Sequence, residues 1–199
     1  MISELIGGRI RSSTLRLGEA LGRWGLTPNL LTGIGLVLNL VVAAVIASGS
    51  LRAGGALLLL ASGFDMLDGA VARASGTETK FGGFLDSTID RYSESLVYGG
   101  VLVYLLGTRD YRVGSLLIIV ATAGSLLISY ARARAEAAGF KASVGLLARP
   151  ERVLIVAIGL LTGYVIPALW ILAIGTHLTV MTRMAHVWRL SRLTEPRAG

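Results

Sequence analysis

The chain has 199 residues, of which 53% are hydrophobic and 16% charged, and its formal net charge is +7. A soluble domain carries about 25% charged residues, so this composition favours an integral membrane protein. The absence of cysteine excludes disulfides and thiolate metal sites, and the spread of basic residues between apolar segments argues against a nucleic-acid-binding protein.

Six apolar segments follow one another along the chain, and most approach the roughly 20 residues that a membrane helix needs. We expect an all-α membrane protein, a single domain over residues 1–199, with a six-helix transmembrane bundle over 30–188. Residues 1–24 are basic and amphipathic, which predicts a helix lying in the membrane interface. The predicted spans are 30–48, 53–74, 84–106, 113–135, 152–166 and 167–188, with Gly163 and Pro167 at the last turn.

The basic residues predict how these spans are oriented. An even number of spans puts both termini on one side of the membrane, and that side would hold sixteen of the nineteen Lys and Arg residues. Only Arg52, Arg109 and Arg112 would lie on the other side. Because Lys and Arg favour the cytoplasmic side, we expect a multi-pass protein of the cell (plasma) membrane with both termini in the cytoplasm.

Four of the twelve acidic residues lie close together in the sequence, at Asp65, Asp68, Asp86 and Asp90. The members of each pair are three or four residues apart, so they face one side of a helix. The loop between the two predicted helices is short, which makes the helices antiparallel neighbours and lets the four carboxylates converge at the cytoplasmic end. Charged groups inside a span are costly, so this cluster needs counter-charge.

Two divalent cations would neutralise the four carboxylates. Ligands that are all oxygen favour Mg²⁺ or Mn²⁺ over zinc or copper, and Mg²⁺ commonly bridges carboxylates and substrate phosphates. Arg73 lies two turns from Asp65 on nearly the same face, which would place a guanidinium beside a bound phosphate. The alternative is that the acids pair with Arg73 and Arg91 as surface charges, but the paired helical spacing argues against it.

The complete pattern is D-x-x-D-G-x-x-A-R, eight further residues, and then G-x-x-x-D-x-x-x-D. It resembles the signature of the CDP-alcohol phosphatidyltransferases, which move a phosphatidyl-type group from a CDP-linked lipid to an alcohol and release CMP. The matching positions are Asp65, Asp68, Gly69, Ala72, Arg73, Gly82, Asp86 and Asp90.

The resemblance implies a role for most of these residues. The four aspartates would hold the metal ions, and Asp90 would also accept a proton from the attacking hydroxyl group. The resemblance assigns contacts with the CDP-lipid to Asn29, Thr32, Gly69, Arg73 and Thr79. A plain helix cap at 27–29 explains the first of these positions equally well.

A group of arginines is expected to recognise the acceptor alcohol. Arg132, Arg152 and Arg183 lie near the cytoplasmic ends of three predicted spans, and guanidinium groups bind phosphate through paired hydrogen bonds. These segments are similar to those of prokaryotic phosphatidylinositol phosphate synthases, which act on CDP-diacylglycerol and inositol 1-phosphate. The resemblance assigns the three arginines to the acceptor phosphate, with Arg134 assisting, and it implies a homodimer with a cytoplasmic active site. Ala148 departs from the pattern, because relatives often carry an acid there.

Two alternatives remain open. The same reaction could use glycerol 3-phosphate or another phosphorylated alcohol as the acceptor. A transporter or cation channel could also use carboxylates inside the membrane. Transporters often contain inverted repeats, however, whereas the acids of this chain are confined to one pair of predicted helices.

Overall fold

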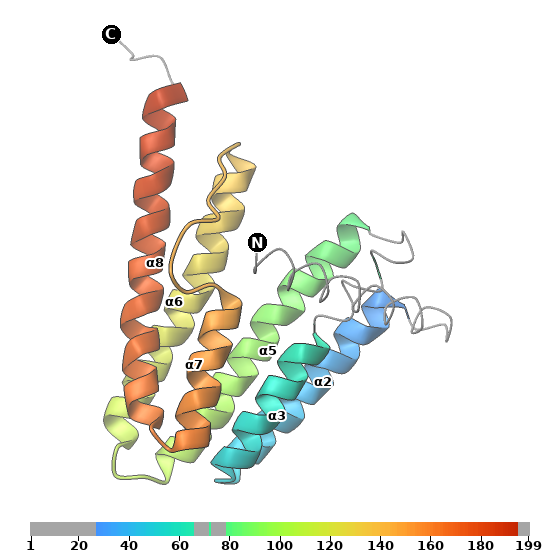
Figure 1. Cartoon of the computed structure of the whole chain (residues 1–199), viewed down its shortest axis with the longest axis vertical. Coiled ribbons are helices and arrows are strands. Elements are labelled where there is room, and N and C mark those ends of the chain that lie inside the picture. Colours follow the sequence, from blue (N-terminus) through green and yellow to red (C-terminus); the bar gives the residue numbers. More distant parts are fainter. Residues whose placement is uncertain (1–26, 66–71, 73–78, 195–199) are drawn as a thin grey trace, which may run out of the picture.

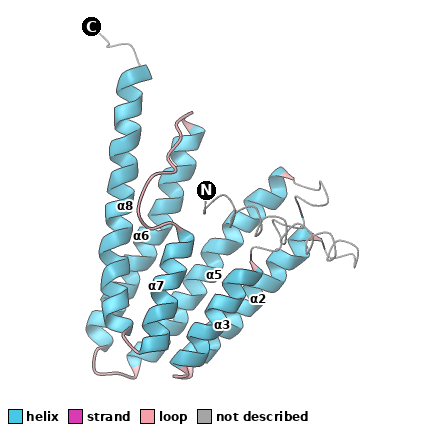
Figure 2. Ribbon diagram, in the orientation of Figure 1, coloured by secondary structure: helices cyan, strands magenta, loops and turns pink. Residues whose placement is uncertain are grey.

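The computed structural model describes residues 27–65, 72 and 79–194, and within these residues the chain is helical, with a longer irregular connection at 138–148 (Figure 2). The predicted interfacial helix over 1–24 lies outside the described residues, as do Asp68, Gly69 and Arg73. The helices are α2 (Pro28–Ala47), α3 (Leu51–Phe64), α5 (Lys80–Leu106), α6 (Tyr111–Ala137), α7 (Arg149–Thr162) and α8 (Val165–Thr194).

The helices form a closed ring in which consecutive helices run in opposite directions (Figure 1). Helix α2 packs against α3 and α5, α5 against α6, α6 against α8, α8 against α7, and α7 against α3. At one end of the bundle, where α5 begins and α6 ends, the α2–α5 pair diverges from the α6–α8 pair. We call this the open end.

The apolar core lies toward the opposite, closed end of the bundle. Ile46, Leu105 and Leu160 are at the last turns of their helices and Leu169 is near the start of α8, and all four are buried. Because apolar contacts hold the helices together at the closed end, the open end is left to polar and charged side chains.

The helix ends follow from local sequence signals. The Thr27 hydroxyl accepts a hydrogen bond from the Leu30 backbone N–H, and the Thr79 hydroxyl accepts one from the N–H of Gly82, so these threonines cap α2 and α5. Gly163 has a φ of +82°, a left-handed conformation that ends α7. The turn predicted at Gly163 is therefore confirmed, whereas Pro167 lies within the first turn of α8.

The described helices follow the predicted segments in order, but only some meet the requirements of a membrane span. Three described helices are long and apolar enough to cross a membrane, namely α2, α6 and α8. Helices α3 and α7 have 14 residues each, about 21 Å at 1.5 Å per residue, which is less than the roughly 30 Å of a bilayer core. Helix α5 has 27 residues but carries several charged side chains in its first half.

Candidate active site

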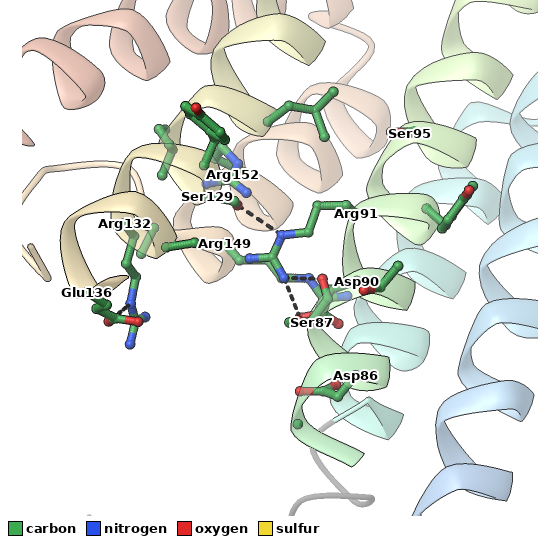
Figure 3. A pocket seen from close by; sticks show the side chains of 18 of the residues that line it. Asp86, Ser87, Asp90, Arg91, Ser95, Ser129, Arg132, Glu136, Arg149 and Arg152 are labelled. Carbon is green, nitrogen blue, oxygen red and sulfur yellow. Dashed lines mark hydrogen bonds and ion pairs between the residues drawn. The ribbon is translucent and has the colours of Figure 1, made fainter. Parts of the chain in front are cut away.

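A cavity of about 1130 Å³ lies between α5, α6, α7 and α8 on the side of the open end (Figure 3). It brings together two groups of residues that the sequence placed far apart. The charged side chains that line it include Asp86, Asp90, Arg132, Arg149, Arg152 and Arg183. Two of the predicted metal ligands and three of the predicted acceptor ligands therefore share one cavity.

Two of the four aspartates predicted to converge, Asp65 and Asp90, lie close together, while Asp68 lies outside the described residues. Asp86 and Asp90 lie one turn apart on α5, and Asp65 follows the last residue of α3. One guanidinium joins the two helices, because Nη2 of Arg149 is 2.7 Å from Oδ2 of Asp65 and its Nη1 is 2.7 Å from Oδ1 of Asp90. The carboxylates of Asp65 and Asp90 are thus close enough to share a single cation.

Helix α2 packs tightly against this cluster through Gly35. A Cβ atom at this position would lie 2.5 Å from Oδ1 of Asp65, closer than real Cβ contacts allow. With glycine at this position, α2 passes beside the carboxylate without the Asp65 side chain having to shift. The Asp65 carboxylate therefore lies against the first half of α2.

The described acids can be tested for their fit to a divalent metal ion. Their donors are all carboxylate oxygens, which suits Mg²⁺ or Mn²⁺, and two of them already converge on a cationic group. Within the described ranges, three acids or histidines do not come together as a ready metal site, but Asp68 lies outside these ranges. The residues present fit a divalent ion that shares Asp65 and Asp90.

The residues predicted to contact the CDP-lipid are only partly brought together. A Cβ at Gly82 would lie 3.0 Å from Oγ1 of Thr79 and 3.5 Å from Oδ1 of Asn29, so both side chains meet at the starts of α2 and α5. Thr32 is largely buried, and its hydroxyl donates to the carbonyl of Pro28 at 3.1 Å. These three residues do not line the cavity described above.

Arg152 is buried and its charge is neutralised. Its Nε and Nη2 donate to the two carboxylate oxygens of Glu94 at 2.6 and 2.7 Å, and Nη1 donates to the carbonyl of Leu147 at 3.2 Å. The Tyr98 hydroxyl donates to the same carboxylate at 3.2 Å. With only 2% of its surface exposed, Arg152 is part of a buried network within the cavity wall.

Arg183 is also buried, but its contacts leave its charge in place. Its Nε donates to the carbonyl of Val144 at 2.9 Å, and its Nη1 donates to the carbonyl of Ile128 at 2.6 Å. No carboxylate pairs with it among the described residues. Because a buried cation held only by carbonyl groups keeps a full positive charge, Arg183 is well suited to bind an anion in the cavity.

The other two predicted arginines differ from each other. Arg132 lines the cavity, and its Nε lies 2.8 Å from Oε1 of Glu136 on the same helix (Figure 3). Arg134 is exposed and does not line the cavity, because residues two apart on a helix point to different sides. The structure does not place Arg134 with the other predicted acceptor ligands.

Three charged residues of this region were not predicted as site residues. Glu94 continues the four-residue spacing of Asp86 and Asp90, and this signal could have placed it on the same face of α5. Arg149 lies three residues before Arg152 and therefore on the same side of α7. Arg91 links α5 to α6 by donating from its Nε to the Ser129 hydroxyl at 2.9 Å (Figure 3).

Comparison with known proteins places the chain in a family. Residues 25–187 match the family model of CDP-alcohol phosphatidyltransferase. The chain belongs to this family. The predicted resemblance is therefore confirmed, and the protein is an enzyme of the phosphatidyltransferase type.

Within this family, the chain is similar to enzymes named for inositol phosphate lipids. The chain is 40% identical to a phosphatidylinositol phosphate synthase of Mycobacteroides abscessus, covering 88% of the chain and 83% of the relative. It is 39% identical to an archaetidylinositol phosphate synthase of Methanothermobacter thermautotrophicus, covering 84% and 86%. The Mycobacterium tuberculosis phosphatidylinositol phosphate synthase with CDP-DAG bound is 34% identical, with a TM-score of 0.82 and coverage of 88% and 93%. A structure of that enzyme with manganese and citrate is equally similar, with the same TM-score and identity.

Proposed function

We propose that this protein transfers the phosphatidyl group of CDP-diacylglycerol to a hydroxyl of inositol 1-phosphate, giving phosphatidylinositol phosphate and CMP. The observation that carries the proposal is the shared cavity, in which the aspartates of α5 lie with the unneutralised guanidinium of Arg183. The aspartates suit a nucleotide-linked phosphate with its metal ion, and the guanidinium of Arg183 suits the phosphate of the acceptor. Similarity to relatives named for inositol phosphate products supports the same acceptor.

The acceptor is better supported than the lipid. The relatives at 39% and 40% identity are named for different lipids, archaetidyl in one and phosphatidyl in the other, but both names include inositol phosphate. Diacylglycerol is favoured for this chain because the similar M. tuberculosis structure holds CDP-DAG.

We propose that Asp65, Asp68, Asp86 and Asp90 hold two divalent ions, Mg²⁺ or alternatively Mn²⁺. When bound, such ions would stabilise the negative charge that develops on the phosphoryl oxygens. The oxygen-only donors and the convergence of Asp65 and Asp90 on one cation support this assignment. The similar structure with manganese supports a divalent ion in a relative.

Asp90 is the proposed base. It lines the cavity, and its side chain is 18% exposed, so a hydroxyl group of the acceptor can reach the carboxylate. The hydroxyl oxygen forms a new bond to the β-phosphorus, the bond from that phosphorus to CMP breaks, and the hydroxyl proton passes to Asp90. CMP carries the bonding electrons away as the leaving group.

The arginines have unequal roles in this proposal. Arg183 binds the acceptor phosphate directly, because its charge has no carboxylate partner in the described part of the chain. Arg152 mainly holds the cavity wall through Glu94, while Arg132 is free to swing between Glu136 and a bound phosphate at the exposed side. Arg134 is left out of the acceptor site, since it does not line the cavity.

The CDP-lipid is proposed to bind along the starts of α2 and α5. Asn29 and Thr79 meet there beside Gly82, on the same side of α5 as the beginning of the aspartate series. Thr32 would shape this surface from within α2. Gly69 and Arg73 remain proposed contacts of the diphosphate on the strength of the motif.

The remaining proposals concern the membrane. We propose that all six helices cross it, with a basic interfacial helix at 1–24, and that the whole chain is one domain. The short α3 and α7 are compatible with crossing because they pack against longer neighbours and the bundle can thin the bilayer locally. The sixteen basic residues that the sequence predicts for one side support cytoplasmic termini and a cytoplasmic active site in the plasma membrane. A homodimer is proposed from the family resemblance.

The acceptor can be tested with purified protein, CDP-diacylglycerol and Mg²⁺. Release of CMP is measured with inositol 1-phosphate, inositol and glycerol 3-phosphate supplied separately. We expect release with inositol 1-phosphate and little with inositol, because Arg183 needs a phosphate. Release with glycerol 3-phosphate alone would refute the proposed acceptor but leave the reaction type intact.

A further inference from the structure

One arginine occupies the place where counter-charge for the aspartates is needed. Arg149, at the start of α7, contacts Asp65 from α3 and Asp90 from α5, each at 2.7 Å. The three side chains are largely buried, with 25%, 12% and 18% of their surfaces exposed, respectively. The bridge therefore connects three helices through one shielded cation.

Nothing else in the described part of the chain holds this guanidinium by a hydrogen bond. Its Nε is buried without a hydrogen-bond partner there, so the two terminal nitrogens and their carboxylates determine where it lies. A buried ion pair is costly to break from one side, because the remaining charges are left uncompensated. Arg91 also lies near Asp90, with its Nη1 3.8 Å from Oδ2, but among the described residues Arg149 is the one whose guanidinium contacts both Asp65 and Asp90.

We propose that Arg149 is a resident counter-cation that holds Asp65 and Asp90 together until a divalent metal ion displaces its guanidinium. This inference rests on the proposed metal site. A metal ion bound by the same carboxylates would use the oxygens that now accept from Arg149, and the like charges of metal and guanidinium would repel. Arg149 is thus a positioning residue that stabilises the metal-free bundle and weakens metal binding.

Metal binding can be measured without turnover. Purified protein is stripped with EDTA, and its thermal unfolding is followed during titration with Mn²⁺, with free Mn²⁺ counted by electron paramagnetic resonance. In Arg149→Gln, which removes the charge, we expect the metal-free Tm to fall by roughly 5 °C or more. The Mn²⁺ concentration at which half of the protein has bound metal, the Mn²⁺ midpoint, should fall by about tenfold, because the competing cation is gone.

Two further variants make the result specific. Arg149→Lys keeps the charge but cannot bridge two carboxylates with a planar fork, so its metal-free Tm and its midpoint should lie between those of the wild type and Arg149→Gln. Arg112→Gln removes one exposed positive charge near the closed end, where α6 begins, and should leave both quantities unchanged. If Arg149→Gln does not fold without metal, the Lys variant supplies the comparison.

Failure of the displacement of Arg149 can be distinguished from failure of the proposed metal site. An unchanged or higher Mn²⁺ midpoint in Arg149→Gln, with normal binding in the wild type, would overturn the displacement and leave the metal site standing. An unchanged metal-free Tm would overturn the bridging role. If the wild type bound no Mn²⁺, the proposed metal site and the inference would both be wrong.

Discussion

At the scale of single residues, the cavity contains two buried arginines with opposite electrostatic situations. Arg152 is paired with both oxygens of Glu94, whereas Arg183 is held by backbone carbonyls alone among the described residues. Sequence spacing could not separate them, since both are arginines near the predicted cytoplasmic ends of their spans. The difference depends on Glu94, which is 58 residues from Arg152 in the chain.

Replacing Arg183 tests this difference. We expect Arg183→Gln to raise the KM for inositol 1-phosphate by about 10- to 100-fold, the effect of losing a charged hydrogen bond, with a smaller change in kcat. Arg192→Gln, on the same helix and stacked on Trp188, is the matched control. An unchanged KM would remove Arg183 from the acceptor site. Arg152→Ala is a poorer test, because it leaves Glu94 buried and unpaired.

The proposed base can be tested separately from binding. Asp90→Asn should lower kcat by about 10²- to 10⁴-fold, because the amide cannot accept the hydroxyl proton. Binding of CDP-diacylglycerol, measured by calorimetry in detergent, should change much less. Asp110→Asn, just before α6 and away from the cavity, should retain full activity. An equal loss of donor binding and rate would mean that Asp90 serves only to bind the metal.

The residues of the site were predictable to different degrees. The aspartates could be found because their three- and four-residue spacing places each pair on one face of a helix. Arg149 could not be found in this way, because its partner Asp65 is 84 residues away and only the packing of α7 against α3 brings them together.

At the scale of elements, α2 and α5 approach each other closely at Gly100. A Cβ on Gly100 would lie 2.8 Å from Cα of Ala43, so the backbones of the two helices are in direct contact. The pair carries Asn29 and the aspartates of α5 at its open end.

The neighbouring glycine provides a matched comparison. Gly100→Ala should destabilise the protein by about 1–3 kcal/mol, because the added methyl group meets backbone atoms that cannot move aside. Gly99→Ala, with open space around the new Cβ, should be neutral or slightly stabilising, since alanine favours the helix by roughly 1 kcal/mol. Thermal unfolding in detergent measures both. Equal effects would contradict the close approach of α2 and α5.

Helix positions were predicted better than helix ends. Apolar composition located the helices, but α5 begins at Lys80, four residues before the predicted start at 84, because Thr79 caps it there. Hydropathy does not register such a cap, since Lys80 and its neighbours are not uniformly apolar. Helix α7 likewise begins at Arg149, three residues earlier than predicted, with Pro150 in its first turn.

At the scale of the whole molecule, the six described helices alternate in direction, so the described ends of the chain lie at the same end of the bundle. The ring order could not be predicted, because the apolar sequence does not specify which helix surfaces meet. The charge distribution does predict a cytoplasmic open end. Orientation in the membrane is therefore the large-scale property that most needs a direct measurement.

The absence of cysteine makes that measurement simple. Lys141→Cys and Arg109→Cys each introduce one thiol at an exposed position, in the α6–α7 loop and the α5–α6 turn. A membrane-impermeant maleimide added to intact cells should label the variant at 109 but not the one at 141, which should react only after the membrane is opened. The reverse pattern would place the cavity outside the cell.

The central claim is that a phosphatidyl group passes intact to inositol 1-phosphate. The most direct measurement is mass spectrometry of the lipids formed by purified protein from CDP-diacylglycerol, Mg²⁺ and deuterated inositol 1-phosphate, with CMP measured in parallel. We expect deuterated phosphatidylinositol phosphate in an amount equal to the CMP released. CMP release without a deuterated lipid would contradict this account, because the CDP-lipid would then be hydrolysed and not transferred.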